Sequence, residues 1–183
     1  MERKWISVLA CFGVLSLSVS TASAIIFSSN ATIGEGNVYS SVDIEGDSTT
    51  VEMTGGSVGQ MVVSGSSALD MSGGEILDSL SVRDSATANI SGGSISELFA
   101  IELSVIKLHG FDVVHHATGG KWDDGKITGK WLDGTGFDIS FYNSGHFGND
   151  TFSHLKILPE PATLILMGVG LTLIRTRRCS RKS

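Results

Sequence analysis

The feature of this sequence that most constrains its fold is an internal repeat of 18 to 19 residues. Gly-Gly pairs recur at 55–56, 73–74 and 92–93, and Gly110 stands where a fourth would fall. A unit this short cannot bury an apolar face by itself, so successive units must stack and share one core. Apolar residues recur at intervals of 18 to 20 residues in five columns: Val42-Met61-Leu80-Phe99, Ile44-Val63-Val82-Ile101, Val51-Leu69-Ala88-Ile106, Met53-Met71-Ile90-Leu108 and Val38-Val58-Ile76-Ile95.

Each repeat also carries the alternation of β-strands. In Val42-Asp43-Ile44 and Val51-Glu52-Met53 every second side chain is apolar, which places one face of the strand inward. Gly, Asp and Ser separate the strands, as turns require. The pattern predicts an all-β fold: a short parallel β-helix of about four coils, each with three short strands, at 37–56, 57–74, 75–93 and 94–110. The period and the Gly-Gly corners resemble the passenger β-helices of bacterial autotransporter adhesins. A β-sandwich with Gly-rich turns is the alternative.

The repeats at 37–110 are flanked by a lead-in at 25–36 and by a segment of different composition. Residues 111–158 hold five of the eight Phe, two of the three Trp and four of the five His. Asp-Gly at 124–125 and 133–134 lies between apolar residues, which is typical of hairpin turns. Strands around 127–128 and 137–142 are therefore expected to pair antiparallel, and 111–158 is interpreted as a β-rich C-terminal cap.

The first 24 residues have the layout of a secretory signal peptide. Arg3 and Lys4 precede an apolar stretch from Trp5 to Val19, and small residues at 22–24 provide a cleavage site. Ile25 would then begin the mature protein after passage through the Sec translocon. An N-terminal membrane anchor is the alternative, but serines and a threonine interrupt the apolar run well short of about 20 residues.

The last 25 residues have the layout of a second targeting signal. Pro159, Glu160 and Pro161 precede an uncharged apolar run at 162–174, and basic residues follow, among them Arg175, Arg177 and Arg178. Basic residues remain on the cytoplasmic side of a membrane, so the run is expected to be a transmembrane helix with a stop-transfer signal. Thirteen residues make only about 20 Å of helix, short of a bilayer core of about 30 Å.

This order of motif, apolar helix and arginine cluster closely resembles the PEP-CTERM sorting signal. Such tails are found on proteins exported by exopolysaccharide-producing Gram-negative bacteria. The resemblance implies that an exosortase, a membrane-embedded cysteine protease, removes the tail and passes the protein from the inner membrane to the surface. The same tail also carries the label of an ice-binding protein C-terminal domain, which describes the tail and implies no ice binding. An ordinary C-terminal membrane anchor is the alternative.

The repeats contain no recognisable catalytic, metal or cofactor motif. Residues 25–158 have neither Cys nor Pro, which excludes a cysteine zinc site and a disulfide framework there. His115 and His116 are adjacent, so on a strand they face opposite sides. The Gly-Gly corners lack the Asp of calcium-binding repeats, and Asp123, Asp124 and Asp133 remain only a weak alternative for calcium.

The net charge of the chain argues against nucleic-acid binding. Residues 25–158 hold 17 Asp and Glu against 6 Lys and Arg, a net charge of −11, and such a surface repels phosphate backbones. The sequence favours an exported, non-enzymatic surface or matrix protein, associated with extracellular polysaccharide. One alternative is a carbohydrate-binding module with Trp122 and Trp131 as stacking platforms, and another is a degraded β-helical polysaccharide lyase.

Overall fold

The computed structural model describes residues 23–117, 125–141 and 150–158, and these ranges are all-β apart from one short turn of 3₁₀ helix. That turn, η1, spans Thr151–His154. The strands are β1 (Ser23–Phe27), β2 (Ala31–Ile33), β3 (Val38–Ile44), β4 (Asp47–Val63), β5 (Ser66–Val82), β6 (Thr87–Ile90), β7 (Ser94–Ala100), β8 (Val105–Ala117), β9 (Gly125–Trp131), β10 (Gly136–Phe141) and β11 (Leu155–Leu158).

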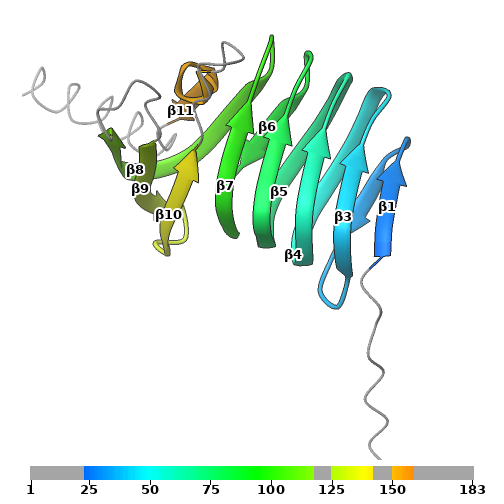
Figure 1. Ribbon diagram of the computed structural model, residues 1–183. Helices are drawn as coiled ribbons and strands as arrows, with labels where there is room; N and C mark the ends of the chain where they lie inside the picture. The colour runs from blue at the N-terminus through cyan, green and yellow to red at the C-terminus, as the bar shows by residue number, and fades with distance from the viewer. Residues whose placement is uncertain (1–22, 118–124, 142–149, 159–183) are drawn as a thin grey trace, which may run out of the picture.

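These strands stack in parallel as a β-solenoid of about five turns, as Figure 1 shows. The turns form two sides. Side A consists of β2, the first halves of β4, β5 and β8, together with β6 and β11. Side B consists of β1 and β3, the second halves of β4 and β5, together with β7 and β10. The predicted parallel β-helix is confirmed, but the three short strands expected in each coil are not separate, because β4 and β5 each run without a break through both sides.

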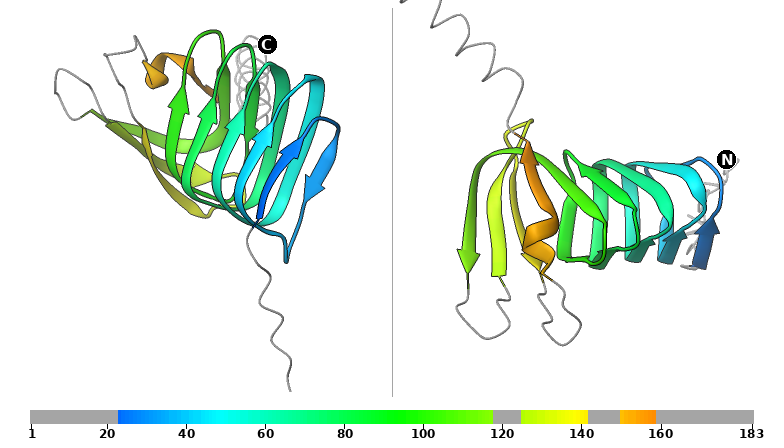
Figure 2. Two further views of the ribbon diagram at one scale, coloured as in Figure 1. Left: turned by 45° about the vertical axis from the view of Figure 1, so that its right-hand side comes forward. Right: turned by 90° about the horizontal axis from the view of Figure 1, so that it is seen from above.

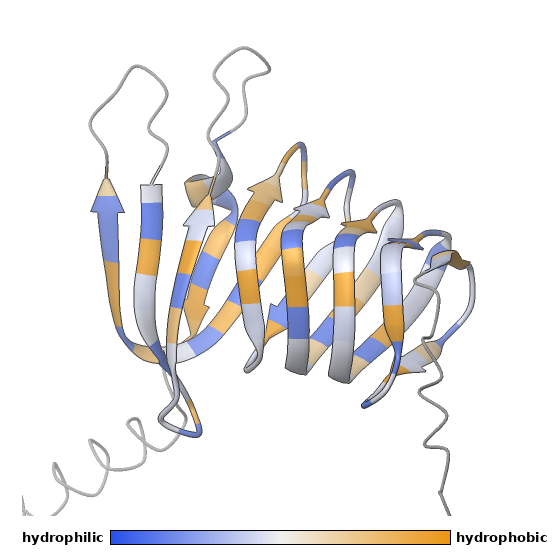
Figure 3. Ribbon diagram, turned by 60° about the horizontal axis from the view of Figure 1, so that its bottom comes forward, coloured by the Kyte–Doolittle hydropathy of each residue, from blue (hydrophilic) through white to orange (hydrophobic). Residues whose placement is uncertain are grey.

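Apolar side chains fill the space between the two sides. Figure 3 shows apolar and polar residues alternating along the strands. Two predicted columns on side A are confirmed residue by residue, because the strand pairs align Val51-Leu69-Ala88-Ile106 and Met53-Met71-Ile90-Leu108. All eight of these side chains are buried.

Two columns on side B are correct for three coils and wrong in the fourth. Leu98, rather than Phe99, pairs with Leu80, and Ala100, rather than Ile101, pairs with Val82. The cause is a bend in the coil. The coil at 75–93 has two residues between Ile76 and Ser79, whereas the coil at 94–110 has one residue between Ile95 and Glu97. The shorter bend turns Phe99 outward.

The fifth column needs a correction at its first member. Tyr39, rather than Val38, pairs with Val58, and Val38 pairs with Ser57. Val38 is accordingly exposed, with 40% of its surface accessible. Tyr39 packs against the core and makes an edge-to-face contact with the ring of Phe27, at 6.4 Å between ring centroids.

The prediction of about four coils is one short, because the lead-in at 25–36 forms a coil of its own. β1 pairs with β3 through Ile25–Val42 and Phe27–Ile44, and β2 pairs with β4 through Ile33–Met53. This coil lacks a Gly-Gly corner, which hid it in the sequence.

The Gly-Gly corners hold two neighbouring coils in very close contact. Gly56, Gly74 and Gly93 have positive φ of 80°, 88° and 90°. A Cβ on Gly74 would lie 2.6 Å from the Gly55 carbonyl oxygen and 2.6 Å from Met53 Cε. Only glycine fits both the backbone conformation and the space.

The turns at the opposite edge use carboxylates instead. Gly46 and Gly65 have positive φ there, and the next two coils place Asp84 (58°) and Glu102 (64°) in the same conformation. Asp84 Oδ2 accepts a hydrogen bond from the Gly65 N–H, and Glu102 Oε2 accepts one from the Asp84 N–H, both at 2.8 Å. These bonds between coils offset the cost of the left-handed backbone.

The C-terminal segment covers one end of the solenoid. β9 and β10 pair antiparallel through Ile127–Ile139 and Thr128–Asp138, which confirms the predicted hairpin. β8 continues past the last coil to pair with β9, and β10 adds in parallel to β7. Figure 2 shows this cap at one end of the stack and β1 at the other. Among the described residues, β1 pairs with β3 alone, so no described strand covers the N-terminal end.

Candidate functional site

The predicted sorting residues lie outside the described ranges. These are Pro159, Glu160 and Pro161 of the motif and Arg175, Arg177 and Arg178 of the stop-transfer signal. β11 ends at Leu158, directly before the motif. Within the described residues no helix is long and apolar enough to cross a membrane, and the predicted helix at 162–174 falls outside them.

Trp131 belongs to the core, which corrects its predicted role as a sugar platform. Only 1% of its surface is accessible, and its ring lies 4.2 Å from that of Phe137. The indole Nε1–H donates a 2.9 Å hydrogen bond to the Gly93 carbonyl oxygen of the last Gly-Gly corner. A ring packed in this way has no open face for a sugar. Trp122, the other predicted platform, lies outside the described residues.

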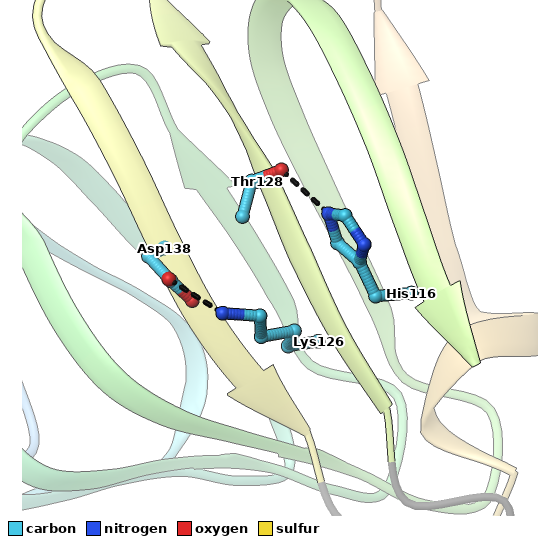
Figure 4. Close-up of polar contacts among 4 residues, drawn as sticks. All are labelled: His116, Lys126, Thr128 and Asp138. Atoms are coloured by element: carbon cyan, nitrogen blue, oxygen red, sulfur yellow. Dashed lines mark hydrogen bonds and ion pairs between the residues drawn. The ribbon is translucent and has the colours of Figure 1, made fainter. Parts of the chain in front are cut away.

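The adjacent histidines point to opposite faces of β8, as their spacing predicts. The His115 ring stacks on Phe152 at 4.0 Å between centroids, whereas His116 lies 2.9 Å from the Thr128 hydroxyl on the exposed face. Figure 4 shows His116 with the neighbouring ion pair of Lys126 and Asp138, which is 2.8 Å long. In the part of the chain that the structure describes, no group of three or more His, Cys, Asp or Glu side chains could hold a metal ion.

The Asp133 carboxylate accepts hydrogen bonds within its own hairpin turn. Its Oδ1 accepts hydrogen bonds from the Thr135 hydroxyl at 2.6 Å and from the Thr135 N–H at 2.8 Å. These two bonds lower the pKa of Asp133 from its ordinary value of 3.8. Asp123 and Asp124, the other weak candidates for calcium, lie outside the described residues.

The outer face of side A carries a shallow groove of about 400 Å³. One row of its lining residues, Glu52, Asp70 and Asn89, runs across three coils. Asn89 Nδ2 donates a 2.6 Å hydrogen bond to Asp70 Oδ1. The remaining lining residues are Thr54, Met71, Ser72, Ser91 and His109. The groove is polar and contains two carboxylates.

The outer face of side B carries a second groove, of about 500 Å³. It is lined by two rows that run along the solenoid axis, Gln60-Ser79-Glu97 and Val62-Ser81-Phe99. The first row is polar, whereas the second has a hydroxyl between two apolar side chains. Among the described residues that line it, Glu97 alone has a charged side chain.

Sequence reasoning missed the second groove because it placed Phe99 in the core. The structure places the ring on the outer face, in line with Val62 and Ser81. The signal was present in the repeat lengths. Ile76 to Leu80 is one residue longer than Ile95 to Leu98, and that difference reverses the faces of every residue after the bend.

Comparison with known proteins gives no relative: no family model, curated protein or solved structure matches this chain.

Proposed function

We propose that this chain is an exported, non-enzymatic protein of the cell surface or extracellular matrix, sorted by an exosortase. The observation that carries the proposal is the tail, in which Pro159-Glu160-Pro161, an apolar run and an arginine cluster follow one another directly. The leader at 1–24 supports the proposal, because a secretory signal would carry the chain across the inner membrane and bring the tail to that membrane from its outer side. The helix at 162–174 then holds the protein in that membrane until the tail is removed.

A stacked fold suits such a role. Each coil of a solenoid contacts only its neighbours and exposes its outer residues in regular rows, which makes a long surface from a short chain. The described domain carries no disulfide that would depend on the redox state outside the cell, since both cysteines, Cys11 and Cys179, lie in the terminal segments.

Mass spectrometry of the exported protein tests this proposal. The mature form should begin at Ile25 and end near Pro159-Glu160-Pro161. Glu160→Ala should retain the protein in the membrane fraction, whereas Glu45→Ala, an exposed carboxylate in a turn of the solenoid, should leave export unchanged. An extracellular form that still contains Arg181 and Lys182 would refute processing by an exosortase.

The second candidate function is carbohydrate binding. The groove on side B favours it, because polar side chains lie beside apolar ones there on an accessible surface. The candidate site then lies on the outer face of the solenoid instead of at Trp131, and a role of Trp122 stays a prediction.

A further inference from the structure

We propose that the groove on side B binds a linear, uncharged polysaccharide that lies along the solenoid axis and crosses several coils. The inference deepens the proposed function, since the biological role of such binding rests on export to a polysaccharide matrix. The binding itself depends only on the groove.

The polar row supplies hydrogen-bonding groups at regular intervals. Gln60, Ser79 and Glu97 lie on successive coils, about 4.8 Å apart as in any sheet. A pyranose unit in an extended chain has a similar length, so each sugar can meet one coil. The amide of Gln60 both donates and accepts, the hydroxyl of Ser79 does the same, and the Glu97 carboxylate accepts. Sugar hydroxyls also act as donors and acceptors.

The row continues beyond the groove at both ends. Ser41 pairs with Gln60 on one side, and Ser140 of β10 pairs with Glu97 on the other. Five consecutive strands of side B therefore present a side chain that can form hydrogen bonds. A polymer can use such a row over its length, whereas a single sugar would use only one or two positions.

The second row provides apolar contact. Val62 and Phe99 flank Ser81 and are half-buried in the groove wall. The ring face of a pyranose carries C–H groups, which pack on aliphatic and aromatic side chains. A groove with apolar contacts along one row and hydrogen-bonding groups along the other fits a ligand that is polar at its edges and apolar on its faces.

The charges select an uncharged polymer. Glu97 is the single charged lining residue of this groove, and the segment 25–158 has a net charge of −11, so a uronate polymer would be repelled. The groove on side A differs, because Glu52 and Asp70 both line it. It serves as an internal comparison within the same protein.

Titration with oligosaccharides tests the proposal. The full chain, purified in a detergent without a sugar headgroup, is titrated with cellohexaose, laminarihexaose and mannohexaose and followed by backbone amide NMR. We expect at least one of these to shift the amides of Gln60, Ser79 and Ser81 and to leave those of Glu52 and Asp70 in place. Hexagalacturonate should bind at least about tenfold more weakly, a difference of about 1.4 kcal/mol.

Two matched variants locate the site. Ser81 and Ser91 are both half-buried serines of the coil at 75–93. Ser81 lines the groove on side B and Ser91 lines the groove on side A. Ser81→Arg fills the groove on side B and should weaken binding at least about tenfold, whereas Ser91→Arg should change it less than about twofold. Glu97→Gln keeps the shape without the charge and should retain binding of an uncharged glycan. Thermal melts establish that the variants are folded.

The proposal is overturned if none of the three neutral hexasaccharides binds, if the shifted amides lie on side A, or if Ser81→Arg and Ser91→Arg weaken binding equally. Loss of binding in Glu97→Gln would also overturn it, because binding of a neutral glycan would then depend on the single Glu97 carboxylate and not on the two rows of the groove. Export and tail processing do not enter this experiment, so its failure is distinct from failure of the proposed function.

Discussion

Val62 and Val63 are neighbours on β4 with opposite environments. Val63 is fully buried between Ile44 and Val82, whereas Val62 faces outward between Asp43 and Ser81. The side chains of adjacent strand residues point to opposite faces of the sheet, so register decides what each position tolerates. The same register assigns Leu98 to the core and Phe99 to the surface.

A polar substitution of similar size should separate the two valines. Val63→Asn buries an amide without partners and should lower the free energy of unfolding by about 2–4 kcal/mol. Val62→Asn should cost less than about 1 kcal/mol, because its amide remains in contact with water. Chemical denaturation of the two full-length variants measures both values. Equal destabilisation would show that the register of β4 is wrong.

Asp133 should titrate below its ordinary value of 3.8, because the hydroxyl and the N–H of Thr135 both donate to its charged form. A lowered folded pKa contributes stability that is present above the ordinary value and is lost as the pH falls through the folded pKa. Thr135→Val removes the hydroxyl and should raise the pKa of Asp133 toward 3.8. Carboxyl NMR across the acid range measures it, and a midpoint at or above the ordinary value in the unsubstituted protein would contradict the expectation.

At the scale of the element, the corners decide how tightly coils stack. Gly36 and Gly74 both have positive φ, but a Cβ on Gly36 would meet nothing within 4 Å, whereas one on Gly74 would meet atoms at 2.6 Å. Gly36→Ala should therefore cost about 1–2 kcal/mol, the price of the left-handed backbone alone. Gly74→Ala should cost clearly more, since Met53 or the Gly55 carbonyl must also move. Denaturant melts compare the two, and equal costs would place the strain in the backbone alone.

The elements also show what the sequence could and could not predict. The columns through Val51 and Met53 were predictable because the alternation of apolar residues after each turn identifies the inward positions of side A, although the spacing varies between 18 and 19 residues. Side B contains a bend that holds one residue in some coils and two in another, and apolar spacing alone does not reveal which. Phe99 and its groove were missed for that reason. Trp131 was missed because its place depends on a hydrogen bond to Gly93, 38 residues away in the sequence.

The whole molecule has two different ends. At the C-terminal end, β9 pairs with β10, and the side chains of Phe137, Ile139 and Phe141 of β10 are buried. A buried hydrogen bond reinforces this closure, since the Ala100 N–H donates to Thr151 Oγ1 at 3.2 Å. At the N-terminal end, Ile25 and Phe27 continue the core columns of Val42 and Ile44 but are only partly buried. Stability should therefore fall along the stack from the cap toward β1.

Native-state hydrogen exchange should record that gradient. Amides of β1 and β2 should exchange fastest among the solenoid strands, because they can open without disturbing the coils beyond them. Amides of β5 and β7 should exchange slowest, since opening them separates coils on both sides. Mass spectrometry of peptic fragments resolves the two regions. Slower exchange in β1 than in β7 would mean that the N-terminal end is covered in solution.

The difference between the two ends also determines how another copy of the chain can pair with the edges of this one. Residues 23–34 contain no charge and no proline, the features that usually keep an edge strand from pairing with another chain. At the other end, β10 lies between β7 and β9, and the edge strand β11 is four residues long and contains Lys156. Of the described strands, β1 and β2 are therefore the exposed edges at one end, and the short β11 is the exposed edge at the other. The cap that buries Trp131 thereby leaves only a short, charged edge at its end of the described stack, which disfavours end-to-end growth into a fibre.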